Sequence, residues 1–397
     1  MKQICSIALC AALLWGLCLP AAAAEPPAEA FPEMQVEINA KAAVLMEANT
    51  GRVLMAQNAH GRLYPASVTK IMTLLLVMEA VESGKIALTD TVTASAEAVS
   101  KGGSQIWLEE GEQMTVDELL KAAAVASAND ACEALGEFVA GSSTAFVAQM
   151  NERARTLGME DTHFVNCTGL DDTTTEHLTS AYDVALMSRE LLRHELVRQY
   201  STIWMDTLRN GETELVNTNR LVRYYDGITG LKTGTTEKAG CCVSATAARG
   251  GLELIAVVLG SETSDDRFNA ARAMLDWGFA NFEAVSLSVD ASLLPPVAVL
   301  GGTQAQVRPV YQKQVTVVLE KGKAQSVTQK PDLAASVAAP VENGQTLGRV
   351  DFLLDGETIA SCDLTAPAAV GRLTFLEALR RVVRLLGGVG QEFSENS

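Results

Sequence analysis

The spacing of apolar residues changes near Glu283, and this change limits the folds that the chain can adopt. Before Glu283, long runs with helical spacing alternate with a few strand-like runs. After it, short apolar runs are separated by Gly, Pro and Asp, and no helical pattern returns until Leu373. Because 397 residues exceed what one ordinary core holds, we expect two domains of different class.

The part before Glu283 mixes helices with strands. Residues 42–56 predict a β-hairpin, since two apolar runs flank a turn rich in Asn, Thr and Gly. Strands are also expected over residues 241–248 and 252–259. Helices are expected from Ser67 onward and over four later stretches, residues 115–140, 144–157, 182–200 and 267–282. This mixture predicts an α/β (α+β) first domain over residues 38–283.

The part after Glu283 predicts a small all-β domain. Residues 315–319, 347–354 and 358–360 are short apolar runs of strand length, with turn residues between them. We place this domain over residues 284–371.

The first 24 residues have the pattern of a secretory signal peptide. Lys2 supplies a positive start, residues 4–19 an apolar centre, and residues 20–24 a run of small residues with an A-x-A cleavage site. A retained anchor helix is the alternative, which the short apolar stretch disfavours. Residues 25–37, rich in Pro, Ala and Glu, predict a linker. The mature protein is therefore expected to be secreted across the cytoplasmic membrane.

Charge and cysteine content exclude several classes of function. The formal net charge of −17 makes nucleic acid an unsuitable partner. Three of the eight Cys lie in the predicted signal peptide, and the other five show no metal-ligand spacing. We expect those five to be small buried hydrophobic residues, with one or two disulfides as the alternative: Cys132, Cys167, Cys241, Cys242 and Cys362. No metal site is expected.

Ser67 and Lys70 stand directly before the apolar run of residues 71–78. On a helix, positions three apart lie on one face, so the hydroxyl and the amine can meet. Burial disfavours the charged form of a Lys, and a neutral amine beside a Ser can take its proton. The pair predicts a serine nucleophile that needs no His. The same spacing also occurs by chance in helices where the Ser caps an end and the Lys is solvated.

Two further motifs favour the catalytic interpretation. Ser127-Ala128-Asn129 places two small polar residues, which prefer caps and turns, inside an Ala-rich helical stretch. Lys232-Thr233-Gly234 lies ahead of the strand expected at residues 241–248. Its Gly is expected to leave room for a substrate backbone, and its Lys offers a positive charge to a carboxylate. The three motifs in this order are typical of class A β-lactamases and penicillin-binding proteins.

Longer blocks around these motifs resemble one family. The blocks are PASVTKIMT, ASANDAC, MNERARTLGMEDTHFVNCTGL, GLKTGTTEKAG and LDWGFANFE. They are similar to those of the low-molecular-mass penicillin-binding proteins, the serine-type D-alanyl-D-alanine carboxypeptidases (peptidase S11 type) of bacterial cell walls. The resemblance spans residues 42–283, and the β-rich part after it resembles the family's C-terminal domain. It implies a β-lactamase/transpeptidase-like fold for the first domain.

The resemblance implies a role for each residue of the first two motifs. Ser67 is the expected acylated nucleophile, with Lys70 as its general base. Ser127 is expected to pass protons, and Asn129 to hold the substrate amide. One position departs from the family pattern, because Ala128 stands where Gly is more frequent.

The third motif is implied to bind the end of the substrate. Lys232 and Thr233 are expected to hold the terminal carboxylate of D-Ala-D-Ala, with Gly234 beside them. The backbone N–H groups of Ser67 and Thr235 are expected to form the oxyanion hole, which stabilises a tetrahedral intermediate by on the order of 3 kcal/mol. No cofactor is implied.

The implied reaction is hydrolysis of the D-Ala-D-Ala bond of peptidoglycan stem peptides through an acyl-enzyme at Ser67. β-Lactam antibiotics mimic this dipeptide and are expected to acylate the same Ser. One alternative is a β-lactamase, but the E-x-x-L-N stretch that class A enzymes use for deacylation is absent between Asn129 and Lys232. The other alternative is a catalytically silent wall-binding protein, which the complete motif set disfavours.

Residues 372–390 predict a short basic amphipathic helix. Its two faces carry Phe375, Leu376, Leu379, Val382, Val383 and Leu386 on the apolar side and Glu377, Arg380, Arg381 and Arg384 on the polar side. Such a helix suits the surface of an anionic membrane and is too short to span a bilayer. The alternative is that its apolar face packs on the β-rich domain. We therefore expect a peripherally attached protein in the periplasm or on the outer face of the cell membrane.

Overall fold

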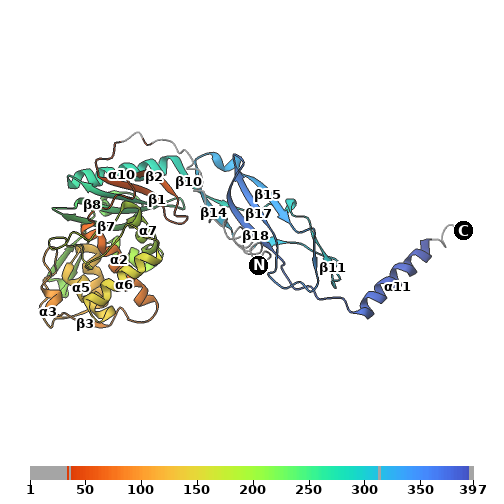
Figure 1. Cartoon of the computed structure of the whole chain (residues 1–397), viewed down its shortest axis with the longest axis horizontal. Helices are drawn as coiled ribbons and strands as arrows, with labels where there is room; N and C mark the ends of the chain where they lie inside the picture. Colours follow the sequence, from red (N-terminus) through yellow and green to blue (C-terminus); the bar gives the residue numbers. More distant parts are fainter. Residues whose placement is uncertain (1–33, 35–36, 312–313, 393–397) are drawn as a thin grey trace, which may run out of the picture. The chain divides into compact units, whose positions relative to one another are not determined.

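The computed structural model describes residue 34, residues 37–311 and residues 314–392 (Figure 1). The predicted signal peptide, residues 1–24, lies outside the described residues. So does the predicted linker, apart from residues 34 and 37. Both stay predictions.

The first domain is built on one five-stranded antiparallel sheet with the strand order β2-β1-β9-β8-β7 (Figure 1). The strands are β1 (Ala42–Glu47), β2 (Val53–Gln57), β7 (Ile228–Thr236), β8 (Gly240–Arg249) and β9 (Leu252–Ser261). The predicted hairpin and the two predicted strands, which correspond to β8 and β9, are confirmed. The edge strand β7 is absent from the prediction, because its Gly- and Thr-rich sequence lacks a regular apolar alternation.

Helices cover both faces of this sheet (Figure 1). α10 (Ser264–Asn281) packs against β8 and β9, and the approach is close enough that a Cβ on Gly278 would clash with Leu45 and Leu254. On the other face, α7 (Ala181–Leu191) packs against β1 and β9. Because both faces are covered, β1 and β9 consist almost entirely of buried residues.

α2 (Lys70–Glu82) is the central helix of the domain. It packs against α5 (Asn129–Ala140), α6 (Ser143–Thr156) and α7. Ten of its thirteen residues are buried. A helix that is apolar on all sides is stable only where protein surrounds it. The first residue of α2, Lys70, is therefore carried into the interior.

The helix predicted over residues 115–140 is interrupted, so this prediction is wrong at one point. α4 (Val116–Lys121) continues into a π-helical turn, η2 (Ala122–Ala126), and α5 starts only at Asn129. Ser127 has φ 60°, in the left-handed region, and Ala128 is extended. Apolar residues keep their helical spacing across this break, so the pattern alone does not reveal it.

Shorter elements complete the first domain. They are η1 (Ala66–Thr69), β3 (Thr91–Thr93), α3 (Ala96–Val99), β4 (Gln113–Thr115), α8 (Glu195–Ser201), β5 (Met205–Leu208), η3 (Arg209–Gly211), β6 (Thr213–Val216) and α9 (Leu221–Tyr224). The single helix predicted over residues 182–200 is thus two helices, α7 and α8. β3 pairs with β4, and β5 pairs with β6.

The second part of the chain consists of short strands, as predicted. Its elements are β10 (Phe282–Leu287), η4 (Ala291–Leu293), β11 (Val297–Leu300), β12 (Gln306–Val307), β13 (Val310–Tyr311), β14 (Val315–Glu320), η5 (Lys323–Ser326), β15 (Thr328–Leu333), β16 (Ser336–Ala338), β17 (Thr346–Leu354) and β18 (Glu357–Thr365). They form the sheets β10-β14, β12-β11-β16 and β13-β18-β17-β15. The predicted boundary between residues 283 and 284 falls inside β10, and the domain bounds stay a prediction.

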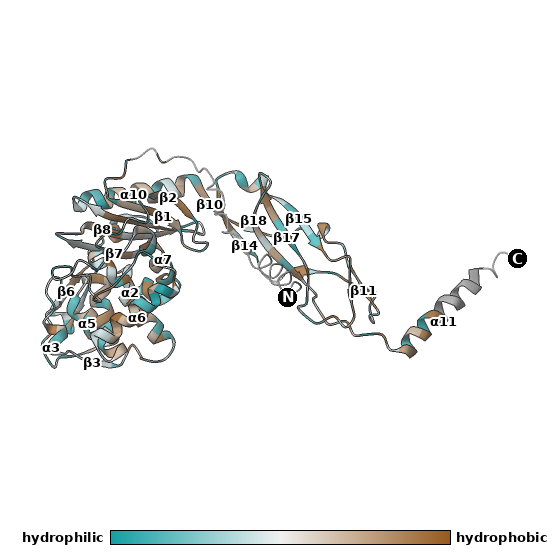
Figure 2. Cartoon of the chain, in the orientation of Figure 1, coloured by the Kyte–Doolittle hydropathy of each residue, from teal (hydrophilic) through white to brown (hydrophobic). Residues whose placement is uncertain are grey.

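α11 (Phe375–Glu392) is the last element of the described chain. Its described turns carry both hydrophobic and hydrophilic residues (Figure 2). Several large apolar side chains on it are exposed to solvent: Phe375, Leu376, Leu379, Val382 and Val383. Among the helices that the structure describes, none is long and apolar enough to cross a bilayer.

We predict that Leu75→Ala, in the middle of α2, lowers the free energy of unfolding of the first domain by about 3 kcal/mol, because it leaves a cavity among fully buried neighbours. Urea unfolding followed by Trp fluorescence measures this, since Trp107, Trp204 and Trp277 all lie in the first domain. Val216→Ala, at a residue that is 44% exposed, is the control and should change the free energy little. Equal effects of the two substitutions would contradict a central position for α2.

Candidate active site

The first motif lies on a strained turn. Ser67 belongs to η1, the 3-10 turn that leads into α2. Ala66, just before it, has φ 49°, a conformation that costs a non-glycine residue about 1 kcal/mol. Lys70 Nζ donates a hydrogen bond to Ser67 Oγ over 2.8 Å. The structure thus brings the hydroxyl and the amine of this motif into direct contact.

Lys70 is completely buried, and its amine has a second fixed partner. Nζ also donates to the backbone carbonyl oxygen of Thr168 over 2.9 Å. Burial lowers the pKa of Lys70 below its ordinary value, and the nearby Cys132 and Asp130 oppose this in part. A Lys amine that loses its proton readily, next to a Ser hydroxyl, can act as a general base.

The second and third motifs meet in the same region. Lys232 Nζ donates to Ser127 Oγ over 2.9 Å and to the backbone carbonyl of Thr233 over 3.0 Å. Ser127 lies at the break between η2 and α5, whereas Lys232 lies on β7. The residue that breaks the helix by its left-handed conformation is therefore the same residue that binds Lys232 in the site.

Lys70 and Lys232 influence each other's protonation. Burial lowers the pKa of the Lys232 amine well below its ordinary value, and the positive charge of Lys70 lowers it further. Both side chains are at most 1% exposed, so water screens this repulsion poorly. The arrangement disfavours two ammonium groups at once and favours one neutral amine in the site.

Asn129, at the start of α5, completes the second motif. Its side-chain Nδ2 donates to the carbonyl of Gly102 over 2.6 Å, and its backbone N–H donates to the carbonyl of Ser104 over 2.7 Å. The other side-chain atom, Oδ1, is buried and has no hydrogen-bond partner within the described residues. A buried unpaired acceptor is costly, which fits a group that waits for an N–H donor.

β7 passes directly beside the Ser67 turn. A Cβ on Gly234 would lie 2.8 Å from the backbone nitrogen of Ser67 and 2.9 Å from the carbonyl oxygen of Pro65. The space at Gly234 is therefore filled by this turn, and the expectation that a substrate backbone lies along the strand at this point stays a prediction. Next to it, Thr233 Oγ1 donates to Thr218 Oγ1 over 2.6 Å, while Thr235 is exposed.

Arg267 supports β7 from α10 and is absent from the predicted site. Its guanidinium Nη1 donates to the carbonyl of Gly234 and to Thr235 Oγ1, each over 2.9 Å, and to the carbonyl of Cys242 over 3.2 Å. The side chain is only 7% exposed. In the sequence, Arg267 is one Arg that follows two acidic residues at the start of a helix, a pattern that also occurs in structural ion pairs and does not point to the site.

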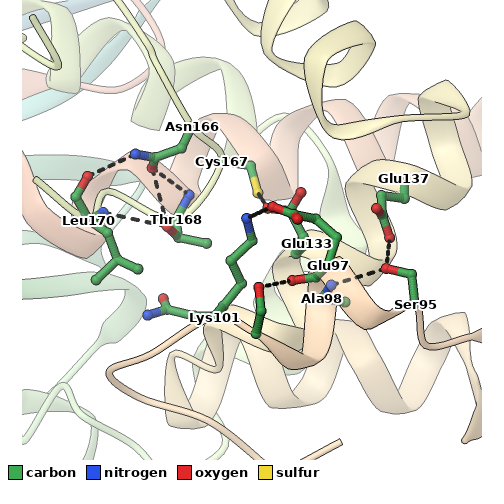
Figure 3. A network of polar contacts seen from close by, with 12 residues as sticks. Ser95, Glu97, Ala98, Lys101, Glu133, Glu137, Asn166, Cys167, Thr168 and Leu170 are labelled. Atoms are coloured by element: carbon green, nitrogen blue, oxygen red, sulfur yellow. Dashed lines mark hydrogen bonds and ion pairs between the residues drawn. The ribbon is translucent and has the colours of Figure 1, made fainter. Parts of the chain in front are cut away.

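A buried carboxylate holds the loop that contacts Lys70. Cys167 Sγ donates to Glu133 Oε2 over 3.1 Å, and Lys101 Nζ lies 3.6 Å from the same oxygen (Figure 3). The next residue, Thr168, accepts the hydrogen bond from Lys70. Glu133 thus fixes the loop at the position from which it orients the Lys70 amine.

The same loop also contacts the Ser67 turn. Gly169 has φ 87°, and a Cβ there would lie 1.8 Å from the carbonyl oxygen of Ala66. His177 Nε2 lies 2.8 Å from Thr69 Oγ1, and the Val165 N–H donates to His177 Nδ1 over 3.0 Å. Because Nδ1 accepts, the imidazole is neutral and Nε2–H donates to Thr69.

Within the described residues, no group of three or more His, Cys, Asp or Glu is arranged to hold a metal ion. The thiols of Cys132, Cys167, Cys241 and Cys242 are free and buried, and Cys362 is buried too. Burial raises the pKa of Cys132 to about 11, so this thiol is inert at neutral pH. The prediction of small buried residues is confirmed.

Comparison with known proteins identifies the family of this chain. A family model for D-alanyl-D-alanine carboxypeptidases, peptidase S11, matches residues 28–263, and a model for the C-terminal domain of penicillin-binding protein 5 matches residues 282–372. The D-alanyl-D-alanine carboxypeptidase DacF of Bacillus subtilis (strain 168) is 39% identical over 387 residues, which cover 96% of this chain and 98% of that protein.

Two solved structures are similar as well. Penicillin-binding protein 5 from Haemophilus influenzae has a TM-score of 0.75 at 32% identity, and the match covers 86% of this chain and all of that one. Penicillin-binding protein D2 from Listeria monocytogenes, in its cefotaxime-bound form, has a TM-score of 0.58 at 32% identity. The match covers 62% of this chain and all of that one.

The fold and the three motifs define a penicillin-binding protein with a catalytic domain and an all-β C-terminal domain. The chain belongs to the peptidase S11 family of D-alanyl-D-alanine carboxypeptidases, which are serine hydrolases. The family resemblance and the fold class predicted from the motifs are confirmed.

We predict that His177 makes the stability of the first domain fall in mild acid. Burial, with a smaller contribution from the charge of His163, lowers the pKa of His177 from 6.5 to about 4. Between these pH values the unfolded chain binds a proton that the folded chain does not. The free energy of unfolding therefore decreases as the pH falls from 6.5 to 4, by at most about 3 kcal/mol.

His177→Gln tests this, because Gln can keep one acceptor and one donor but does not titrate. Urea unfolding at several pH values should show that the variant is less stable than the wild type at pH 7.5, and that the difference shrinks as the pH falls to 4. A difference that stays constant across this range would mean that His177 does not titrate as its burial implies.

Proposed function

We propose that this chain is a serine D,D-carboxypeptidase that removes the terminal D-Ala from peptidoglycan stem peptides through an acyl-enzyme at Ser67. Three motifs far apart in the sequence meet in one largely buried region, and this carries the proposal. Lys70 contacts Ser67, Lys232 contacts Ser127, and the backbone at Gly234 touches the Ser67 turn. Membership of the S11 family supports the same reaction.

In the proposed acylation, the neutral Lys70 amine takes the proton of Ser67 as Oγ attacks the carbonyl carbon of the D-Ala-D-Ala bond. The 2.8 Å contact and the burial of the amine support this role, because a neutral amine at this distance can accept the Ser67 O–H instead of donating to its oxygen. The proton then passes through the Ser127 hydroxyl to the nitrogen of the departing D-Ala. Ser127 receives the Lys232 hydrogen bond at its oxygen, so its own proton is free to be donated.

The substrate carboxylate is proposed to bind beside Lys232, Thr233 and Arg267. A carboxylate near Lys232 favours the protonated form of that amine, because opposite charges stabilise each other. The restored charge on Lys232 in turn lowers the pKa of Lys70, which keeps the base neutral. Substrate binding would thus leave Lys232 protonated and Lys70 neutral, ready to act as the base.

The developing oxyanion is proposed to bind the backbone N–H groups of Ser67 and Thr235. The close approach of β7 to the Ser67 turn at Gly234 supports this, since it brings these two backbone segments together. Asn129 is proposed to hold the substrate amide, and its unpaired Oδ1 supports an N–H donor as partner. In the second step, water gives a proton to Lys70 and attacks the ester carbon. Lys70 then returns this proton to Ser67 Oγ as the ester bond breaks, which restores the Ser67 hydroxyl and the neutral amine.

β-Lactams are proposed to form an ester at the same Ser67. The Listeria relative was solved with cefotaxime bound, which supports this for a chain of similar fold. No Glu follows the class A β-lactamase pattern between Asn129 and Lys232, so slow hydrolysis of the ester is expected.

We also propose that the mature protein is secreted and is attached peripherally to a membrane. The pattern of residues 1–24 supports secretion. The exposed apolar side chains at the start of α11, with Arg380 and Arg381 on the same helix, support binding to an anionic lipid surface.

We expect that the purified wild-type protein gains the mass of one penicillin per chain and that Ser67→Ala gains none. Intact-mass spectrometry measures the adduct, and release of D-Ala from diacetyl-L-Lys-D-Ala-D-Ala measures the carboxypeptidase activity. Turnover of penicillin without an adduct would identify a β-lactamase. Absence of adduct, turnover and D-Ala release would identify a catalytically silent wall-binding protein.

Deletion of residues 373–397 is expected to release the protein from membranes and to leave penicillin acylation unchanged, because the deleted residues lie outside the predicted catalytic domain. Co-sedimentation with vesicles that contain anionic lipid measures this. Arg380→Gln with Arg381→Gln should weaken the binding and its dependence on salt. A truncated protein that still sediments with the vesicles would exclude α11 as the anchor.

A further inference from the structure

Residues 102–108, which we call the strap, cross next to the second motif. Asn129 fastens the first half of the strap, because its side chain and backbone donate to the carbonyls of Gly102 and Ser104. Trp107 follows three residues after Ser104 on the same strap. Its neighbours Ile106 and Leu108 bind Asp130, the residue directly after Asn129, so the backbone at Trp107 lies close to the second motif.

Two charged side chains hold the second half of the strap. The Asp130 carboxylate, completely buried, accepts the N–H of Ile106 over 3.1 Å and the N–H of Leu108 over 3.1 Å. From the tip of the β5–β6 hairpin, Arg209 donates to the carbonyl of Ile106 over 2.9 Å and to that of Trp107 over 3.4 Å. The backbone on both sides of Trp107 is thus fixed by groups that are themselves rigidly placed.

Trp107 is held in an unfavourable state. Its φ is 57°, a left-handed conformation that non-glycine residues rarely adopt, and its side chain is 75% exposed. The exposed ring adds little to the core, so the fold gains little from this arrangement. Backbone strain that the surroundings impose next to an active site points to a function for the strained residue.

The charge around Trp107 indicates which ligand fits it. Glu109 and Glu110 follow on the chain and are exposed. The positive charge of Arg209, which also lies near Trp107, is paired with Glu112 over 2.7 Å. The face of an indole ring attracts cations, and neighbouring carboxylates strengthen that attraction. An ammonium group on an aliphatic chain matches this surface, because the chain packs on the ring and the charge meets the carboxylates.

We infer that Trp107, with Glu109 and Glu110, binds a cationic side chain on the residue that precedes D-Ala-D-Ala in the substrate. This inference rests on the proposed function. The buried Oδ1 of Asn129 lacks a partner within the described residues and is placed to accept an N–H of the substrate backbone. In this inference, a substrate backbone bound at Asn129 continues along the strap, so that the preceding side chain reaches Trp107 and Trp107 determines specificity.

Two peptides that differ only in one charge test the inference: Nα-acetyl-L-Lys-D-Ala-D-Ala, with a free ammonium group, and its diacetylated, neutral form. The wild type should show a higher kcat/KM for the charged peptide.

Trp107→Ala should lower kcat/KM for the charged peptide about five-fold or more, and it should change kcat/KM for the neutral peptide less. Trp107→Phe should retain part of the preference. Tyr224→Ala, at a residue 72% exposed on α9, is the matched control and should leave the ratio unchanged.

Binding measured without turnover separates this inference from the proposed function. In a Ser67→Ala background, calorimetry should show tighter binding of the charged peptide, and Trp107→Ala or Glu110→Gln should reduce the difference. Equal affinities for the two peptides, or a preference that survives Trp107→Ala, would overturn the inference. If the wild type releases no D-Ala while the binding preference follows Trp107, the proposed function is wrong and the inference stands as a binding site.

Discussion

Burial of two lysine amines in one apolar domain is the constraint on which the site depends. Lys70 is drawn into the interior because it starts α2, a helix that is apolar on all sides. Lys232 lies on the edge strand β7, with its amine against Ser127. Removing an ammonium group from water is costly, so each amine has a hydroxyl and a backbone carbonyl as partners and its pKa is lowered.

Several segments in or next to the site carry backbone strain. Ala66, Ser127 and Trp107 all have positive φ and lie next to or within the site. Each is held by contacts from elsewhere: the Gly169 loop touches Ala66, Lys232 binds Ser127, and Asp130 holds the backbone beside Trp107. The apolar core around α2 thus maintains conformations that these residues would not adopt alone.

Groups outside the motifs set the position of the general base. Lys70 is oriented by the Thr168 carbonyl, and the loop of Thr168 is held by Glu133 and by the neutral His177. The same imidazole ties this loop to Thr69, within the turn of the nucleophile. A single set of contacts therefore links the nucleophile, the base and the surrounding loop, which explains why small polar residues in this region are buried.

The sequence by itself determined the two-part organisation, most of the long helices and strands, and the identity of the three motifs, because these depend on local spacing and composition. It did not reveal β7, the break at Ser127, or Arg267. Their conformations depend on contacts between distant residues: Lys232 and Ser127 are 105 positions apart, and Arg267 is 33 from Gly234. Only the tertiary structure decided these features, since apolar periodicity reports which side of an element is buried and not which polar groups meet there.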